Sequence, residues 1–371
     1  MSGLHELQEP GPLSAKLHYL LHAMQKKYPA VERLAIALYD PGSDWVKTFV
    51  AIEREANPLP FYHARLRDTT WLQAVATSQS PRVINDFSVL EDSNKRHVQA
   101  LLAVGYRASY TVPMCVNGQF FGFVFFNSCT PGLFQGALLA ELDMLAHFAS
   151  LLVYNEHANV RTLLATLKSA MNMARARDPE TGNHLERMSR YARLIAQQIG
   201  AAFGQDDSFV EHVYLFAPLH DLGKITIPDQ VLLKPGPLNA EEQVIMREHA
   251  RAGLTLVEQI LENFGLAGVG QIHLLRNIIL HHHELFDGSG YPDGLAGDNI
   301  PLESRIVTVA DVFDALTSQR PYKQAWPNEQ AFDWLQQQSG RLFDPRCIHA
   351  LLSCQDEIEH IQHCFAENIY G

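Results

Sequence analysis

The chain has 371 residues, of which 47% are hydrophobic and 19% are charged, and its formal net charge is −12 at pH 7. This length allows about two domains with hydrophobic cores, and the composition excludes a disordered chain. The net negative charge argues against binding to polynucleotides, because that binding needs basic side chains that displace counterions from phosphates. A small anion could still bind where cations gather in one cleft.

The five cysteines form no CxxC pair. We therefore expect reduced thiols, no disulfide framework and no thiolate zinc site. The N-terminus lacks the apolar region and the cleavage site of a secretory signal. The longest apolar stretch, Phe120–Phe126, is too short to span a bilayer. These features predict a cytoplasmic protein that does not bind membranes.

Residues 1–150 have the pattern of a mixed α/β domain. Residues 13–27 are predicted to be helical, and residues 34–40, 48–52 and 108–116 to be strands. The clearest local signal is Asn117-Gly118, a hairpin turn with β-rich sequence on both sides. Strands and helices in this order predict an antiparallel sheet flanked by helices.

A long helix is predicted across residues 138–175, because apolar residues recur there at spacings of three and four. No proline or glycine interrupts residues 137–177. A parallel coiled coil with a second copy of the chain is one interpretation of this pattern. A helix packed against its own domain is the other.

The remaining chain, residues 160–371, is rich in predicted helices and in histidine–carboxylate combinations. Five places combine imidazoles and carboxylates at usable spacings: Glu180 with His184, His220 with Asp221, His249, His281–Glu284, and Asp311. Each one alone could be a packing residue or a solvated pair. Together they indicate metal binding, because isolated buried carboxylates are costly whereas coordinated ones are stabilised.

The donor types limit the metal. Nitrogen and oxygen ligands without thiolates favour Fe or Mn over a tetrahedral structural zinc. A carboxylate such as Asp221 can bridge two ions, and paired ions suit phosphoester hydrolysis because they bind phosphate oxygens and activate a water.

Two resemblances sharpen these predictions. The hairpin and its surroundings in residues 13–150 resemble a GAF domain, a module that senses small molecules; a scaffold that only dimerises is the alternative. His220-Asp-Leu-Gly-Lys224, followed by His282-His-Glu and Asp287-Gly-Ser-Gly-Tyr-Pro292, resembles the HD-GYP phosphodiesterases of the HD superfamily. The combined expectation is an α+β two-domain protein, with a GAF-like domain, a long connector helix and an all-α HD-GYP domain.

The HD-GYP resemblance implies hydrolysis of cyclic di-GMP to pGpG, and then to GMP, by attack of a metal-bridging hydroxide. It implies two or three divalent metals, with Fe first and Mn as the alternative. Asp221 is the implied bridge, and Glu180 the residue that adds a third ion. The implied metal ligands are Glu180, His184, His220, Asp221, His249, His282, His283 and Asp311.

The same resemblance implies substrate contacts. Lys224 is expected to contact the scissile phosphate. The other expected contacts are Arg320, Lys323, Asp314, Gly290, Tyr291 and Pro292. The implied partners are cyclic di-GMP, pGpG, an unidentified small-molecule ligand of the GAF-like domain, a second copy of the chain and signalling proteins.

Two features depart from the family pattern. The segment around residues 265–271 lengthens the spacing between His249 and His282, and His281 adds a third histidine that we interpret as a packing residue. Three alternatives stay open: a non-catalytic receptor for cyclic di-GMP, a hydrolase of another cyclic dinucleotide, and a scaffold, which leaves the carboxylates unexplained.

Overall fold

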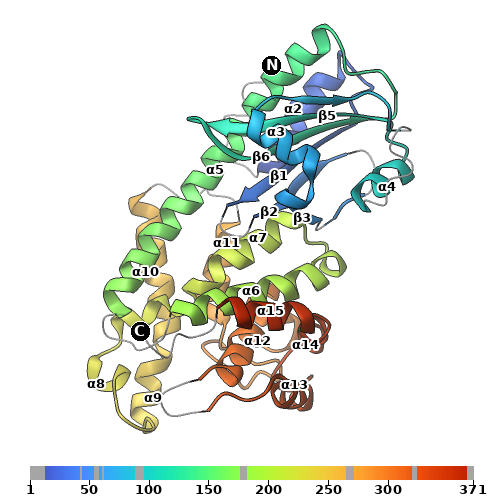
Figure 1. Ribbon diagram of the computed structural model, residues 1–371. Coiled ribbons are helices and arrows are strands. Elements are labelled where there is room, and N and C mark those ends of the chain that lie inside the picture. Colours follow the sequence, from blue (N-terminus) through green and yellow to red (C-terminus); the bar gives the residue numbers. More distant parts are fainter. Residues whose placement is uncertain are drawn as a thin grey trace. The chain divides into compact units, whose positions relative to one another are not determined.

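The protein forms two compact units (Figure 1). The first comprises Met1–Asn159 and Asp206–Ser208, and the second comprises Val160–Gln205 and Phe209–Gly371, so one boundary falls within a long helix. The structure is a computed structural model, and it describes residues 13–41, 44–53, 58–60, 62–87, 96–175, 182–264, 271–319 and 324–365. The first unit is built on one sheet and the second is helical. The predicted α+β class is therefore confirmed.

The sheet of the first unit has six strands in the order β3-β2-β1-β6-β5-β4, and every neighbouring pair is antiparallel. The hairpin between β5 and β6 turns at Asn117 and Gly118, whose φ angles are 52° and 76°. Positive φ at both positions matches the twist of the flanking strands, so the predicted turn is confirmed. The strands are β1 (Arg33–Asp40), β2 (Trp45–Ile52), β3 (His63–Arg65), β4 (Arg82–Ile84), β5 (Ala108–Val116) and β6 (Gln119–Ser128).

One face of the sheet carries the main core of this unit. Helices α2 (Leu13–Gln25) and α5 (Ala137–Arg175) cover it, and their Leu17 and Leu142 are fully buried with Ile36 and Phe126 of the sheet. The other face is covered by α3 (Thr70–Ser78) and α4 (Arg96–Ala103), with smaller apolar clusters. The sheet therefore separates two environments, because successive side chains of a strand point to opposite faces.

The predicted long helix is present as α5. Its segment Ala137–Glu156 is long and apolar enough to cross a membrane by length and composition, although its apolar residues are not as continuous as those of Phe120–Phe126. Leu142, Ala149 and Val153 of this segment are completely buried in the core of the first unit. Packing against its own domain therefore accounts for the apolar pattern in this part of the helix.

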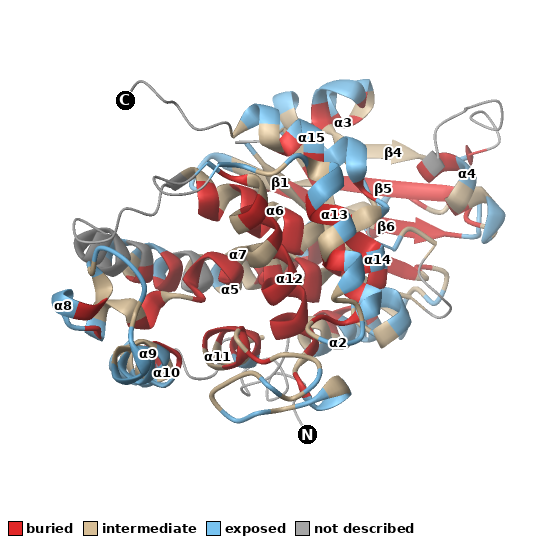
Figure 2. Ribbon diagram, turned by 90° about the horizontal axis from the view of Figure 1, so that it is seen from below, coloured by how far each residue is buried: buried red, intermediate tan, exposed pale blue. Residues whose placement is uncertain are grey.

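The second unit is an assembly of helices around α12 (Leu302–Thr317), which is largely buried (Figure 2). Phe313 of α12 packs against Tyr191 of α6, with ring centroids 5.1 Å apart. The other helices are α6 (Gly182–Ile199), η3 (Gly200–Phe203), α7 (Asp207–Phe216), η4 (Ala217–Leu219), η5 (Leu222–Thr226), α8 (Asp229–Leu232), α9 (Ala240–Arg247), α10 (His249–Asn263), α11 (Ile272–His281), η6 (Gly297–Asn299), α13 (Asn328–Gln337), α14 (Pro345–Leu352) and α15 (Gln355–Cys364).

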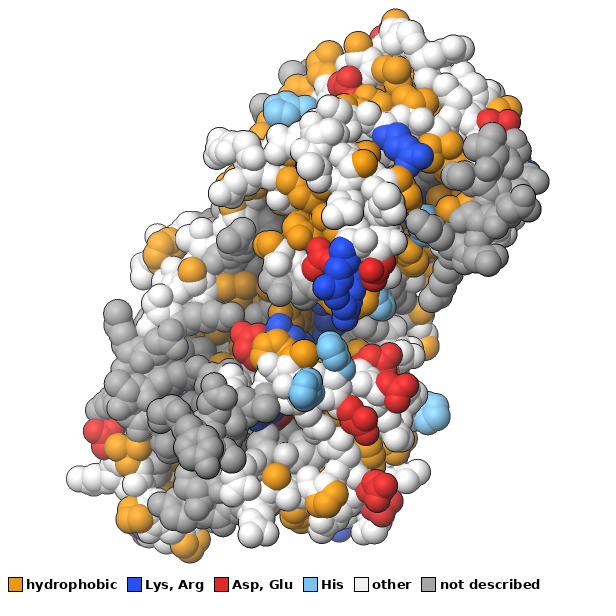
Figure 3. Space-filling view, in the orientation of Figure 1, with side chains coloured by type: hydrophobic (Ala, Val, Ile, Leu, Met, Phe, Trp, Pro, Cys, Tyr) orange, Lys and Arg blue, Asp and Glu red, His pale blue; other side chains and the backbone are white. Residues whose placement is uncertain are grey.

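Acidic side chains gather on the surface over the C-terminal helices (Figure 3). Asp333 of α13 and Asp356, Glu357 and Glu359 of α15 are all exposed there. Such a patch disfavours contact with phosphate backbones on this face.

Two glycines allow η5 to lie directly against α10. A Cβ at Gly223 would be 1.8 Å from the carbonyl oxygen of His249, and one at Gly253 would be 2.8 Å from Ile279. No side chain fits at either position without moving backbone or a buried neighbour. The contact brings the residues just before η5 close to the first residue of α10.

We expect Gly223→Ala to destabilise the second unit. The added methyl group must push η5 and α10 apart, and overpacking of this kind costs about 1–3 kcal/mol. Chemical denaturation of the full-length chain measures the loss of stability. Asp356→Glu, which adds one methylene at an exposed position of α15, is the control and should change nothing. Unchanged stability of Gly223→Ala would show that the helices separate without cost.

Candidate metal centre

The potential ligands of the second unit form two neighbouring groups. Asp221, His249, His282 and His283 make the first group, and His184, His220 and Asp311 make the second; within each group the donor atoms lie within 4.8 Å of one another. Residues from five helical segments and the connections between them therefore converge on one place.

Helix ends position most of the imidazoles. His220 follows η4, His249 begins α10 and His282 follows α11, whereas His184 lies on α6 and Asp311 on α12. His184, His220, His249 and His282 are at most 4% exposed. At a helix end, the ring can reach a carbonyl of the preceding turn without leaving the interior.

Three of these rings use that possibility. Nδ1 of His220 lies 2.9 Å from the carbonyl oxygen of Ala217, and Nδ1 of His249 lies 2.7 Å from that of Met246. Nδ1 of His282 lies 3.0 Å from the carbonyl oxygen of Ile278. Because a carbonyl only accepts, each Nδ1 carries the proton, and the neutral ring then directs the lone pair of Nε2 into the site.

These lone pairs face one another. Nε2 of His249 is 3.3 Å from Nε2 of His282, and two unprotonated nitrogens cannot form a hydrogen bond. Nε2 of His184 is also buried and makes no hydrogen bond to a described residue. A cation is the partner that satisfies such an arrangement, so the residues present fit divalent metal ions.

Asp221 lies between the two groups. Its Oδ1 is 3.3 Å from Nε2 of His249 and 3.7 Å from Nε2 of His282, and its Oδ2 is 3.1 Å from Nε2 of His220. One carboxylate thus presents one oxygen to each group. This is the geometry expected of a residue that binds two ions.

The protonation states of the Asp221 carboxyl and of the imidazoles are set by burial and by neighbouring charges. Burial opposes ionisation of Asp221, but the ammonium group of Lys224, whose Nζ is 2.8 Å from Oδ2, holds the pKa of this carboxyl well below its usual range. Burial also lowers the pKa of His249 to about 4, and that of His283 well below the usual value. The site therefore combines an ionised carboxylate with neutral imidazoles, the protonation states that metals require.

Asp314 does not have the exposed position expected of a substrate contact. Its side chain is fully buried, and it accepts hydrogen bonds from Nδ1 of His184 at 2.8 Å and from Nε of Arg187 at 2.7 Å. Ser318 donates to the same carboxylate at 2.9 Å. Asp314 therefore orients His184 rather than meeting the substrate, a correction that only the packing of α12 against α6 reveals.

Sequence reasoning missed Arg187, and it named Glu284 as part of the His282-His-Glu motif without a role; both residues order the site. Arg187 holds Asp314 through two nitrogens; it lies three residues after His184, on the same face of α6, which is a spacing that could have identified it. Glu284 accepts hydrogen bonds from the backbone N–H groups of Asp293 and Leu295 and is 2% exposed. It thereby fixes the loop that follows the histidines.

That loop closes against the histidines. A Cβ at Gly290 would lie 2.3 Å from the backbone nitrogen of Leu285, so only glycine permits the approach. Tyr291 stacks on His283 with ring centroids 4.7 Å apart, and its peptide bond to Pro292 is cis.

His281 lies in a different cluster, with Glu284 and Asp293. The predicted residues Glu180, Arg320 and Lys323, and most of the segment around residues 265–271, lie outside the described residues.

Comparisons with known proteins agree with this arrangement. Residues 17–153 match the GAF domain family, and residues 168–347 match the HD domain family. The chain is 49% identical over 196 residues to the cyclic di-GMP phosphodiesterase response regulator RpfG of Xanthomonas campestris, which covers 53% of this chain and 49% of that protein. It is 40% identical over 199 residues to a cyclic di-GMP phosphodiesterase of Thermotoga maritima, covering 54% of this chain and 51% of that one.

A third relative has a different substrate in its name. The chain is 39% identical over 186 residues to the 3′3′-cGAMP-specific phosphodiesterase 2 of Vibrio cholerae, covering 50% of this chain and 34% of that protein. The chain spans about half or less of the length of these relatives. A region that matches the GAF domain family thus precedes one that matches the HD domain family, and over about half of its length the chain is similar to phosphodiesterases of cyclic dinucleotides.

Proposed function

We propose that this protein hydrolyses cyclic di-GMP to pGpG, with divalent metal ions held by the two ligand groups. The observation that carries the proposal is the position of Asp221, with one carboxylate oxygen toward each group of buried imidazoles. The similarity to named cyclic di-GMP phosphodiesterases supports this choice of substrate. Fe is the first choice of metal and Mn the alternative, because the donors are nitrogen and oxygen.

The metal ions would supply the activation of a water molecule and the neutralisation of phosphate charge. The protein supplies their ligands in the right protonation states. His249 and His282 direct lone pairs inward because backbone carbonyls hold their Nδ1 protons. Asp311, with Oδ1 3.5 Å from Nε2 of His184, completes the second group.

Lys224 is the cation of this site that is placed to meet substrate. Its side chain is 24% exposed, whereas that of Asp221, to which it bonds, is 12% exposed. The ammonium group can therefore contact a phosphate from the side that solvent reaches. A fixed cation there stabilises the negative charge that develops in the transition state.

Arg187 and Asp314 act through His184. The carboxylate of Asp314 accepts a hydrogen bond from the Nδ1–H group of His184, so the unprotonated Nε2 is left for coordination. Arg187, through Nε and a terminal nitrogen, keeps this buried carboxylate ionised and in place. These two residues position a ligand and do not contact the substrate.

Glu180 carries the further proposal of a third metal ion and a second hydrolysis, from pGpG to GMP. A third cation beside the other two could hold the terminal phosphate of pGpG. The related 3′3′-cGAMP-specific enzyme means that turnover of the different cyclic dinucleotides must be compared directly.

We also propose that the GAF domain binds a regulatory ligand, and that the protein is a cytoplasmic homodimer.

The primary test combines metal analysis with product chromatography. Anaerobically purified protein is expected to contain two or three Fe or Mn ions per chain and to release pGpG, and then GMP, from cyclic di-GMP. Asp221→Asn should lose metal and lower turnover by at least about 10³-fold, because both ligand groups lose a charged oxygen. Asp356→Asn is the exposed control. A protein that holds metal and binds the nucleotide without releasing product would be a receptor.

The role of Glu180 is tested by Glu180→Gln. We expect one metal ion per chain to be lost, with the first hydrolysis retained and pGpG accumulating, because the amide is a poor ligand for a third cation. Metal analysis and time courses of pGpG and GMP separate the two steps. An unchanged metal content with normal GMP formation would contradict the assignment.

The positioning role of Arg187 predicts a loss of metal affinity. Arg187→Lys keeps the charge but cannot hold both oxygens of Asp314, so the affinity should fall about 10–100-fold, as for other residues that orient metal ligands. Competition with a chelator measures the change. The control is Arg190→Lys on the same helix, where the arginine pairs with the exposed Glu186. Equal metal affinity in both variants would refute the role of Arg187.

A further inference from the structure

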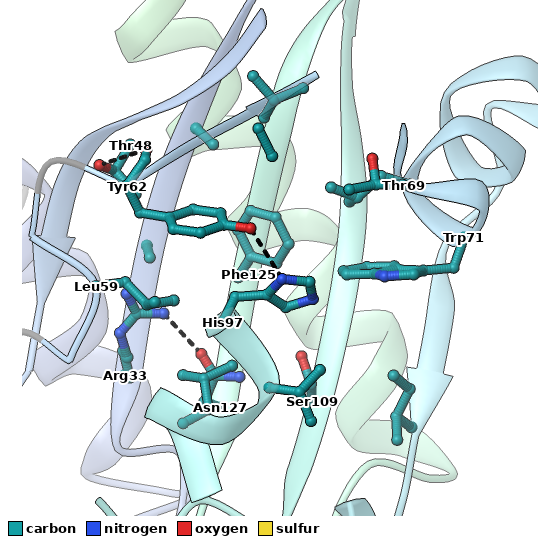
Figure 4. Close-up of a pocket in the computed structure, with 18 of the residues that line it drawn as sticks. Arg33, Thr48, Leu59, Tyr62, Thr69, Trp71, His97, Ser109, Phe125 and Asn127 are labelled. Carbon is teal, nitrogen blue, oxygen red and sulfur yellow. Dashed lines mark hydrogen bonds between the residues drawn. The ribbon is translucent and has the colours of Figure 1, made fainter. Parts of the chain in front are cut away.

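The first unit contains a cavity of about 220 Å³ on the face of the sheet that α3 and α4 cover (Figure 4). Four of its lining residues on the strands are small: Ala35, Ala37, Ala64 and Ser109. On the opposite face, larger side chains fill the core with α2 and α5. These small side chains on the strands leave room for the cavity beneath α3 and α4.

Aromatic rings form the wall of this cavity. The ring of His97 lies between those of Tyr62 and Trp71, with centroid distances of 5.6 and 5.8 Å, and the hydroxyl of Tyr62 is 2.9 Å from Nδ1 of His97 (Figure 4). Phe125 of β6 also lines the cavity. Flat, largely apolar walls with a few polar groups favour a planar ligand that can lie against the rings.

The charges around the cavity are unbalanced. The described lining residues include Arg33 and Arg82 but no aspartate or glutamate. Arg33 is neutralised, because its Nε is 3.2 Å from the carboxylate of Glu53, and its terminal nitrogen donates to Asn127. Only the charge of Arg82 is left without a compensating carboxylate among the residues that the structure describes.

Arg82 lines the cavity and packs against its aromatic wall. Its guanidinium lies 5.3 Å from the ring of Trp71, which keeps it against the aromatic wall. One of its terminal nitrogens is buried and makes no hydrogen bond to a described residue. A buried donor on a cation is costly unless an acceptor reaches it, and an anionic acceptor is the most favourable one.

We infer that this cavity binds a planar aromatic molecule with one negative charge, whose rings lie against Trp71 and His97 and whose anionic group meets Arg82. This assignment rests on the proposal that the GAF domain binds a ligand, and it does not depend on the activity proposed for the HD domain. It is tested by binding alone, so its failure would leave the phosphodiesterase proposal untouched.

The test uses two fluorescent probes with the full-length protein. 1-Anilinonaphthalene-8-sulfonate carries one negative charge, and N-phenyl-1-naphthylamine has the same rings without it. We expect one saturable site per chain, with energy transfer from tryptophan, and a preference of about tenfold for the sulfonate, as a charge-assisted hydrogen bond provides.

The variants separate charge from shape. Arg82→Gln should weaken sulfonate binding about tenfold and leave the uncharged probe unaffected, and Arg82→Lys should keep most of the preference. The matched control is Arg65→Gln, because Arg65 lies 5.3 Å from the ring of Trp45, and it is not among the residues that line the cavity. Unchanged sulfonate binding by Arg82→Gln, or equal affinity for both probes in the unmodified protein, would overturn the inference.

A cavity-filling variant tests the place of binding. Ser109→Leu should abolish binding of both probes, while circular dichroism and the melting temperature show that the first unit is still folded. If a folded Ser109→Leu protein still binds the sulfonate with the original affinity, the probe lies elsewhere and the inference fails.

Discussion

The ionised carboxylate of Asp221 is the constraint on which the arrangement of the second unit depends. A buried negative charge among neutral imidazoles is stable only if cations compensate it. Lys224 supplies one positive charge within the protein. The lone pairs of the surrounding imidazoles require others, and divalent metal ions meet both requirements at once.

Contacts with the backbone determine how the ligands around Asp221 are oriented. The imidazoles are fixed by carbonyls of their own helix ends, so their orientation follows from where each helix stops. Gly223 and Gly253 let η5 and α10 touch, which sets the distance between Asp221 and His249. The ligand geometry is thus built into the packing of the helices.

The first unit uses its sheet differently. One face is filled with large side chains under α2 and α5, which stabilises the domain, while small residues on the other face leave room beside α3 and α4. The first face thus carries the main core, and the second face holds the cavity to which we assign a ligand.

The sequence by itself determined the local features: the turn at Asn117-Gly118, the long helix α5 and the donor types of the metal centre. These depend on dihedral preferences, side-chain periodicity and ligand chemistry, which neighbouring residues specify. The tertiary structure decided which of the α12 carboxylates Asp311 and Asp314 faces the site. Asp314 forms a hydrogen-bonded ion pair with Arg187, 127 residues away in the chain. Asp311 instead lies with the metal-ligand group of His184 and His220.

The sequence also could not predict which arginine of the cavity is paired with a carboxylate. Arg33 and Arg82 are the same residue type on strands of one sheet, and only the fold shows that Glu53 neutralises the first and that no described carboxylate pairs with the second. The reason is physical: the energy of a charge depends on the groups within a few ångströms of it, and long-range packing chooses those groups.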